Sequence, residues 1–258
     1  MGLVCRRPRR TASLVLCSLA CVAAGCGDDE PTAPAGPQPG TVNLQMMHQV
    51  DGAALAFDQI LYTNAAGDEF SVVRLDYLIS NLVLHGTGGS THEVSGPFFS
   101  SARDAPTLRH TLAAVPAGDY DRVSFTFGLA ETLNATNAFV DEDWNSRMTW
   151  PSVLGGGYHY MIMDGFVRNP SGGDDLTYNT HLGRTGTDPH SFAVTLPVDR
   201  FTVDGNESDI RIVMEIQEWY VNPNVYAFPE QPFIMDKPDI QETLRANGST
   251  VFSAEVAP

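Results

Sequence analysis

The sequence predicts an all-β fold: a two-sheet antiparallel β-sandwich with long loops, forming a single domain. Short runs of alternating apolar and polar residues recur along the chain, and helical periodicity is weak. Turn sequences such as AAGD, PAGD and VDGNES separate these runs. Many short strands with few helices are typical of a sandwich.

The predicted strands follow one another from residue 42. The run VNLQMMHQV has one apolar face, made by every second residue: Val42, Leu44, Met46, His48 and Val50. The runs RVSFTFGL, SFAVTLPV and DIRIVMEI repeat this alternation from residues 122, 191 and 209. The segment FSVVRLDYLISNLVL is apolar on both faces, which predicts a central strand, and we expect it to bend near Ser80 and Asn81.

Helical structure is expected in two places only. In DIQETLRANG, Ile240 and Leu244 are four residues apart and Gly248 follows as a possible end of the helix. Residues 131–148 are acidic and irregular, and we interpret them as a long loop with a helical turn.

The first 40 residues are expected to direct export. Residues 1–25 contain four arginines followed by an apolar run, which is typical of a secretory signal peptide. Their end, VAAGC, resembles a bacterial lipoprotein cleavage box, so we expect Cys26 to be lipidated, although an ordinary signal peptide cut elsewhere is an alternative. Residues 26–40 read as a proline-rich acidic tether, and residues 41–258 as the folded domain. These features predict a lipid-anchored protein of the bacterial cell envelope, periplasmic or on the outer-membrane surface.

Charge and cysteine positions limit the possible functions. The formal net charge is −16, and four of the 15 basic residues lie in the predicted signal peptide, so nucleic acid is an unsuitable partner. All four cysteines lie at or before Cys26. The exported domain would therefore have no disulfide and no thiolate ligand, and a metal site must use histidine, methionine, carboxylates or a modified side chain.

Enzyme signatures are missing from the sequence. It contains no GxSxG, no HExxH, no phosphate-binding loop and no GxGxxG after a strand. The GGGY at residues 155–158 precedes a strand and has no following lysine, so it is interpreted as a flexible segment that allows close backbone approach. We therefore expect a binding protein and no enzyme.

Three histidines are candidate metal ligands: His48, His159 and His181. Imidazole is the commonest protein ligand for copper and zinc. A histidine on an apolar strand face is, however, more often a core residue with satisfied nitrogens. In YHYMIMDG, alternation would place His159, Met161 and Met163 on one face, but same-face neighbours lie about 7 Å apart and cannot chelate alone. We therefore favour a packing role for the two methionines.

The other histidines and the acidic loop carry weaker signals. His85, His92, His110 and His190 flank glycines, polar residues or loops and are predicted to lie at the surface. The acidic run at residues 141–143 could bind calcium, but it lacks the alternating ligand spacing of an EF-hand, which favours a solvated loop.

Five separated segments together resemble the MbnP-like copper-binding domain, the family of the methanobactin-associated periplasmic protein and of copper-binding proteins secreted by methanotrophs. They are, in chain order, YTNAAGDEFSVVRLDYLISNLVL, PAGDYDRVSFTFGL, MTWPSVLGGGYHYMIMDG, YNTHLG and IMDKPDIQETLRANGSTVF. The resemblance covers nearly all of the chain after the tether.

The resemblance implies a β-sandwich that binds copper through histidines and, in some members, through a tryptophan oxidised to kynurenine. It further implies a dihaem partner of the MauG or cytochrome c peroxidase type that performs the oxidation. Carried onto this chain, His48, His159 and His181 become candidate ligands and Trp150 the first candidate for oxidation. Trp144 and Trp219 are weaker candidates.

The sequence thus predicts a copper-binding envelope lipoprotein that contacts the membrane only through its lipid. An alternative remains open: a lipoprotein without metal whose loops, around residues 139–150, bind a sugar or a protein.

Overall fold

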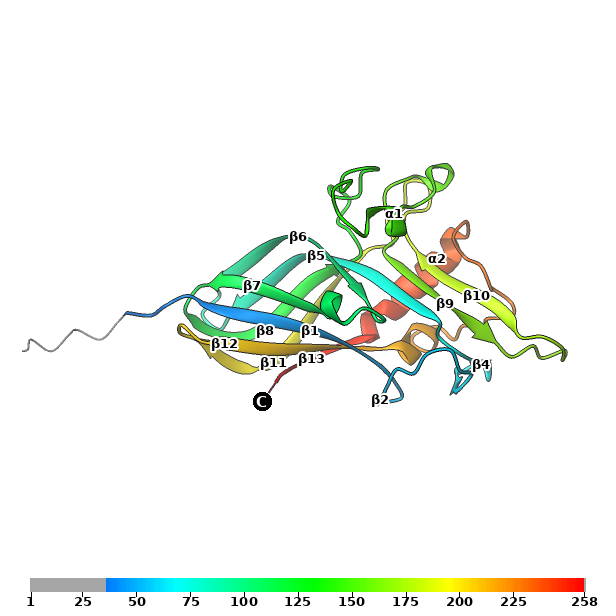
Figure 1. The fold of residues 1–258 in the computed structure, drawn as a ribbon, viewed down its shortest axis with the longest axis horizontal. Helices are drawn as coiled ribbons and strands as arrows, with labels where there is room; N and C mark the ends of the chain where they lie inside the picture. Colours follow the sequence, from blue (N-terminus) through cyan, green and yellow to red (C-terminus); the bar gives the residue numbers. More distant parts are fainter. Residues whose placement is uncertain (1–35, 258) are drawn as a thin grey trace, which may run out of the picture. The chain divides into compact units, whose positions relative to one another are not determined.

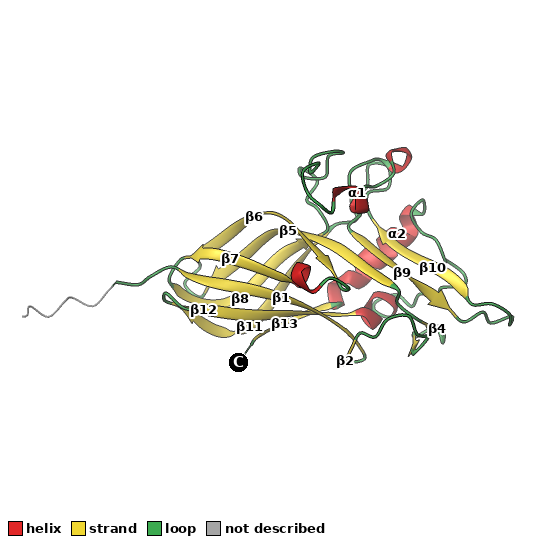
Figure 2. Ribbon diagram, viewed as in Figure 1, coloured by secondary structure: helices red, strands yellow, loops and turns green. Residues whose placement is uncertain are grey.

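The computed structural model describes residues 36–257. The predicted signal peptide, Cys26 and most of the predicted tether lie outside this part of the chain. Within it, two β-sheets pack face to face, with short helices and loops at one end (Figures 1 and 2). This confirms the predicted all-β sandwich. Among residues 36–257, no helix has the length and apolar character needed to cross a membrane.

The smaller sheet has five strands and is built around β1 (Gly40–Val50). Its other members are β2 (Ala53–Ala54), β7 (Arg109–Val115), β12 (Glu207–Glu215) and β13 (Phe252–Val256). One pairing differs from the antiparallel prediction, because β1 and β12 run parallel from Thr41↔Glu207 to Gln49↔Glu215. Hydrophobic alternation has the same period in both kinds of ladder and so cannot reveal strand direction.

The larger sheet has eight strands and is built around β5 (Arg74–Gly86). Its other members are β3 (Tyr62–Thr63), β4 (Glu69–Phe70), β6 (Thr91–Ser101), β8 (Gly118–Phe127), β9 (Met161–Val167), β10 (Leu176–Leu182) and β11 (Phe192–Val203). The start of β5 pairs with β9 and its later part with β8. The pairing register shifts next to Asn81, whose φ is 49°, so the predicted bend is present.

The two faces of β5 have different surroundings, because neighbouring strand residues point in opposite directions. Tyr77 points inward, where its hydroxyl lies 3.0 Å from Nε2 of His48 on the smaller sheet. Its neighbour Asp76 points outward and is fully buried beneath the loops. A central strand covered on both faces explains the nearly continuous apolar sequence.

Two α-helices lie toward the same end of the sheets (Figures 1 and 2). The longest, α2 (Pro238–Asn247), matches the predicted helix, and α1 (Asn145–Met148) is the predicted turn in the acidic loop. Four short 3₁₀ turns complete the fold: η1 (Ala105–Leu108), η2 (Ser152–Leu154), η3 (Ile216–Tyr220) and η4 (Gly248–Thr250). The buried Gln241 of α2 hydrogen-bonds the backbone of His181 and Gly183 at one edge of β10, which protects that edge from pairing with another chain.

We predict that Gly165→Ala destabilises the sandwich by about 1 to 3 kcal/mol, the usual cost of overpacking a core. A Cβ at this position of β9 would lie 2.0 Å from the backbone oxygen of Ser71 and 2.6 Å from the ring of Tyr178. Urea unfolding measures the change. Gly88→Ala is the matched control, because its Cβ would have no neighbour within 4 Å, and a loss as large as that of Gly165→Ala would contradict the steric explanation.

Candidate metal centre

His159 and His181 lie side by side on the outer face of the larger sheet. Their ring centroids are 5.2 Å apart and the planes are nearly perpendicular, at 81°. His181 belongs to β10, whereas His159 lies two residues before β9 begins. His159 is 7% exposed, so the pair is largely shielded from water.

Hydrogen bonds orient both imidazoles. Nδ1 of His159 lies 3.2 Å from the backbone oxygen of Met148, and Nε2 of His181 lies 2.7 Å from a carboxylate oxygen of Asp164. Both partners can only accept, so these two ring nitrogens carry the hydrogens in the neutral rings. The lone pairs are therefore on Nε2 of His159 and Nδ1 of His181. Both of these nitrogens are buried and have no hydrogen-bond partner among residues 36–257.

Trp150 forms the third side of this cluster. Its ring centroid lies 4.6 Å from that of His159, with the planes at 75°. The indole is 1% exposed, and its Nε1 is likewise buried without a hydrogen-bond partner in the described part of the chain. It packs against Gly183, where a Cβ would lie 2.5 Å from the indole ring. Only glycine at residue 183 leaves room for Trp150 in this place.

A tight reversal of the chain brings Trp150 to His159. The amide of His159 donates to the oxygen of Met148 at 2.6 Å, and the amide of Trp150 donates to the oxygen of Gly157 at 2.9 Å. The intervening glycines at 155–157 all have positive φ, and a Cβ on Gly157 would lie 2.4 Å from Oδ1 of Asn134. This confirms the expected close backbone approach at GGGY.

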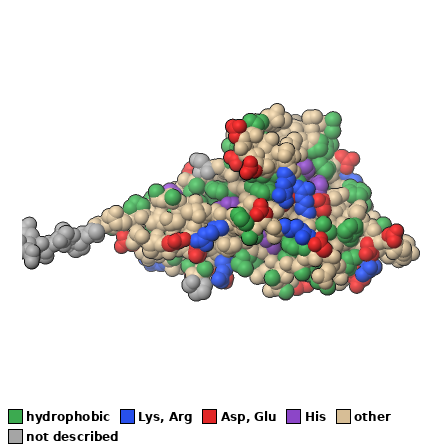
Figure 3. All heavy atoms as spheres, viewed as in Figure 1, with side chains coloured by type: hydrophobic (Ala, Val, Ile, Leu, Met, Phe, Trp, Pro, Cys, Tyr) green, Lys and Arg blue, Asp and Glu red, His purple; other side chains and the backbone are tan. Residues whose placement is uncertain are grey.

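An ion-pair network fixes the surroundings of the cluster. Asp76 accepts hydrogen bonds from Arg74, at 2.5 Å, and from Arg147 of α1, at 2.6 and 2.8 Å. Arg74 also lies 4.0 Å from Asp164, which holds His181. The chain of charges therefore runs from α1 through β5 to His181. Figure 3 shows basic and histidine side chains close together beneath the loops that carry acidic groups.

Burial sets the protonation of the cluster. It lowers the pKa of His159 to about 4, and the nearby His181 acts in the same direction, so His159 is neutral at pH 7. Burial alone would raise the pKa of Asp164, but the hydrogen bonds from His181 and Asn179, with the charge of Arg74, leave that pKa below its ordinary value. The centre thus holds the neutral imidazole of His159 close to the ionised carboxylate of Asp164.

His48 is not part of this cluster. It lies on the inner face of β1, where its ring contacts Tyr77 at a centroid distance of 5.6 Å. The larger sheet separates it from His159 and His181, since Tyr77 points inward while Arg74 and Asp76 point outward with the pair. Within residues 36–257, no group of three or more His, Cys, Asp or Glu side chains is arranged to hold a metal ion.

The strand face predicted for His159 also differs from the structure. Met161 and Met163 are fully buried and pair with Tyr77 and Leu75, on the inner face. His159 precedes the strand and pairs instead with Met148, which turns its side chain to the outer face. Strand alternation holds only from Met161, where β9 begins, and so does not apply to His159. The predicted packing role of the two methionines is confirmed.

The two weaker tryptophan candidates lie outside the cluster of His159, His181 and Trp150. Trp219 packs in the core against Phe127, with ring centroids 5.2 Å apart, and Trp144 stacks on Phe99 at a centroid distance of 6.1 Å.

Two histidines predicted at the surface are buried, since His110 is 9% exposed and His190 is 3% exposed. His110 pairs with Leu44 on the inner face of the smaller sheet, where strand alternation along β7 buries it.

Asp164, Arg74 and Asp76 were not singled out from the sequence. Asp164 and Asn179 face each other across β9 and β10, and His181 is two residues further along β10. That register, and with it the bond between Asp164 and His181, cannot be read from residue spacing. An aspartate in the middle of the otherwise apolar segment of β5 was the one available signal for Asp76.

We predict that acid destabilises the fold as pH falls from about 6.5 to about 4. Burial lowers the pKa of His110 and of His159 to about 4, whereas the unfolded chain has a value near 6.5. The unfolded state therefore takes up protons first, and each residue removes up to about 3 kcal/mol across this window. Urea unfolding at several pH values measures the loss. His110→Gln should flatten the curve, and an unchanged slope would contradict this assignment.

Comparison with known proteins agrees with the resemblance seen in the sequence. No curated protein sequence matches the chain. A solved structure, MbnP from Methylosinus trichosporium, matches with a TM-score of 0.53 and 12% identity, covering 84% of this chain and 99% of that chain. At this identity the match shows a shared fold. The MbnP family model matches residues 39–236, and the chain belongs to the MbnP family.

Proposed function

We propose that this protein binds copper between Nε2 of His159 and Nδ1 of His181. The supporting observation is that these two lone-pair nitrogens belong to adjacent rings and are both buried without a partner. Leaving a buried polar atom unsatisfied costs about 1 to 3 kcal/mol, and a metal ion bound there would remove that cost for both.

The donor set favours copper over harder metals. Imidazole nitrogens suit copper and zinc, whereas calcium and magnesium require several oxygen ligands. Asp164 is already engaged by His181, so it supports a ligand and is not itself free to bind. Two neutral donors in a dry site, with an indole face nearby, suit a monovalent copper ion better than a divalent ion that needs further ligands. The membership in the MbnP family is consistent with this choice.

Trp150 is the proposed additional component of the site. Its indole is the only tryptophan ring of the described domain that contacts a histidine. Oxidation to kynurenine would open its pyrrole ring and expose an arylamine and a ketone oxygen next to His159, adding donor atoms. The oxidant would come from a separate dihaem protein of the MauG or cytochrome c peroxidase type.

The protein would act in the cell envelope as a copper carrier or store and would not catalyse a reaction itself. Lipidation at Cys26 and the acidic tether would hold the domain at a membrane surface. The alternative, a scaffold that binds a sugar or protein without metal, predicts no copper retention against a chelator.

We predict that His159→Ala and His181→Ala each weaken copper binding by at least about 100-fold, since either change removes one of two ligands. Copper competition with a Cu(I) chelator and metal analysis of the purified domain measure the affinity. His48→Gln is the matched control, because it changes a buried histidine on the opposite face of the sheet and should leave copper affinity unchanged. Loss of copper in His48→Gln but not in His159→Ala would contradict the proposed site.

The proposed modification has its own readout. The intact mass of the protein isolated from its native cells should show the gain of two oxygen atoms and the loss of carbon monoxide, located at Trp150 by peptide fragmentation. The recombinant domain made without a dihaem partner should lack the change. An unmodified Trp150 in the native protein, or the same change at Trp144 or Trp219, would contradict this part of the proposal.

A further inference from the structure

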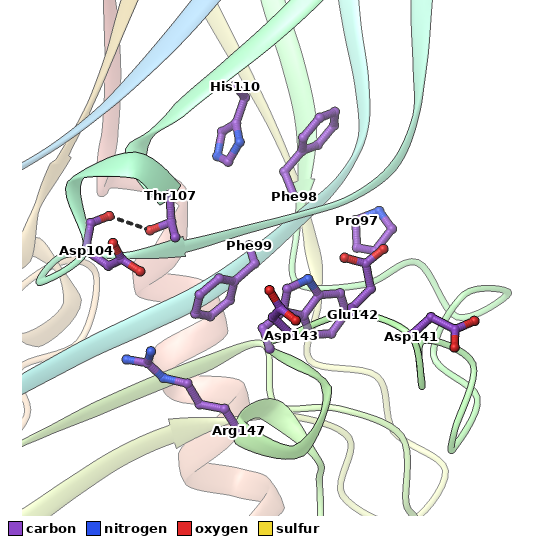
Figure 4. A pocket seen from close by; sticks show the side chains of 11 residues that line it. Pro97, Phe98, Phe99, Asp104, Thr107, His110, Asp141, Glu142, Asp143 and Arg147 are labelled. Carbon is purple, nitrogen blue, oxygen red and sulfur yellow. Dashed lines mark hydrogen bonds between the residues drawn. The ribbon is translucent and has the colours of Figure 1, made fainter.

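A second candidate site lies beside α1, whose Arg147 is one of its lining residues. It is a cavity of about 530 Å³ between strand β6, the turn η1 and the acidic loop at 141–143 (Figure 4). The volume is within the range of about 300 to 1,000 Å³ that small-molecule sites occupy. No residue proposed to bind copper lines this cavity.

The charge around the cavity is strongly negative. Four carboxylates line it, those of Asp104, Asp141, Glu142 and Asp143, and none of them forms an ion pair with the described part of the chain. Arg147 is the one basic side chain among the lining residues, and it is bound to the buried Asp76. A bound cation would therefore meet carboxylates that have no other counter-charge.

The walls of the cavity are aromatic. Phe98, Phe99 and Trp144 line it, and Trp144 stacks on Phe99 at an interplanar angle of 17°. Arg147 already holds its guanidinium 5.4 Å from the centroid of Phe99. Aromatic faces next to carboxylates favour a cation that also carries an apolar body, because both parts of such a ligand gain a partner.

His110 gives an independent indication of a ligand. Its ring lines the cavity, is 9% exposed, and contacts Phe98 at a centroid distance of 5.1 Å. One ring nitrogen, Nε2, bonds the hydroxyl of Ser100 at 2.9 Å, whereas Nδ1 has no hydrogen bond to the described residues. Figure 4 shows the ring reaching toward the space between Phe98 and Thr107. Because Nδ1 keeps some contact with solvent while the rest of the residue is largely buried, it is placed to bond a polar group of a ligand at the cavity wall.

We propose that this cavity binds an organic cation, an amine or guanidinium attached to a flat apolar group. The carboxylates of the 141–143 loop hold the charge, the rings of Phe98, Phe99 and Trp144 hold the apolar part, and His110 bonds a polar group at the inner end. This goes beyond the proposed copper site, because it uses other residues and needs no metal.

The test uses phenethylamine as the probe, titrated into the metal-free domain and followed by calorimetry and by protein NMR shifts. Phenethyl alcohol is the matched ligand control, since it has a similar shape without the charge. We expect saturable amine binding that weakens with added salt and is at least about fivefold tighter than alcohol binding, as one favourable charge contact of about 1 kcal/mol implies. His181→Ala should bind the amine as well as the unaltered protein, which separates this site from copper binding.

Substitutions in the 141–143 loop test whether the amine binds at this cavity. E142Q combined with D143N should weaken amine binding about fivefold, because two exposed carboxylates are removed without loss of packing. D174N is the control, an exposed carboxylate on a distant loop. The proposal is overturned by equal affinity for amine and alcohol, by absence of saturable binding, by an unchanged affinity in the double variant, or by displacement of the amine with equimolar calcium chloride.

Discussion

The buried carboxylate of Asp76 holds together the parts from which the candidate metal centre is built. It is fully buried on β5, and an ionised group in such a place is stable only with charged partners, here Arg74 and Arg147. Arg147 belongs to α1, so satisfying Asp76 fixes that helical turn against the sheet. The last residue of α1, Met148, presents the carbonyl that orients His159, and Trp150 lies two residues further along the chain.

The larger sheet has one face toward the core and one toward the loops, and this determines where each histidine lies. Tyr77 and Asp76 are neighbours on β5, yet one reaches the inter-sheet core and the other the loops. His48 and His110 therefore belong to a polar part of the core, while His159 and His181 belong to the outer centre. The four histidines therefore form two separate groups, one in the core and one at the candidate metal centre, because the larger sheet lies between them.

Alternation in the sequence was sufficient to predict the sandwich and the inward face of β1 with His48. The bend of β5 near Asn81 was also expected from the sequence. It was insufficient where a strand ends or a loop doubles back. His159 was assigned to the wrong face because β9 starts at Met161, and the pairing of residues 148–150 with 157–159 has no periodic signal. For the candidate centre, residue types identified His159, His181 and Trp150. Their support by Asp164 depends on the register of β9 with β10, which only the folded chain specifies.

The parallel ladder between β1 and β12 has a consequence for how the domain forms. Asn43 of β1 hydrogen-bonds Asp209, which is 166 residues further along the chain, and β1 occupies the middle of its sheet. The first strand of the domain therefore lacks its partner β12 until almost the whole polypeptide is present. Contacts over such sequence distances slow folding, since a long loop must close before they form. A newly made chain would remain incompletely folded until its last strands arrive, and removal of β12 and β13 would take support from the first strand of the domain.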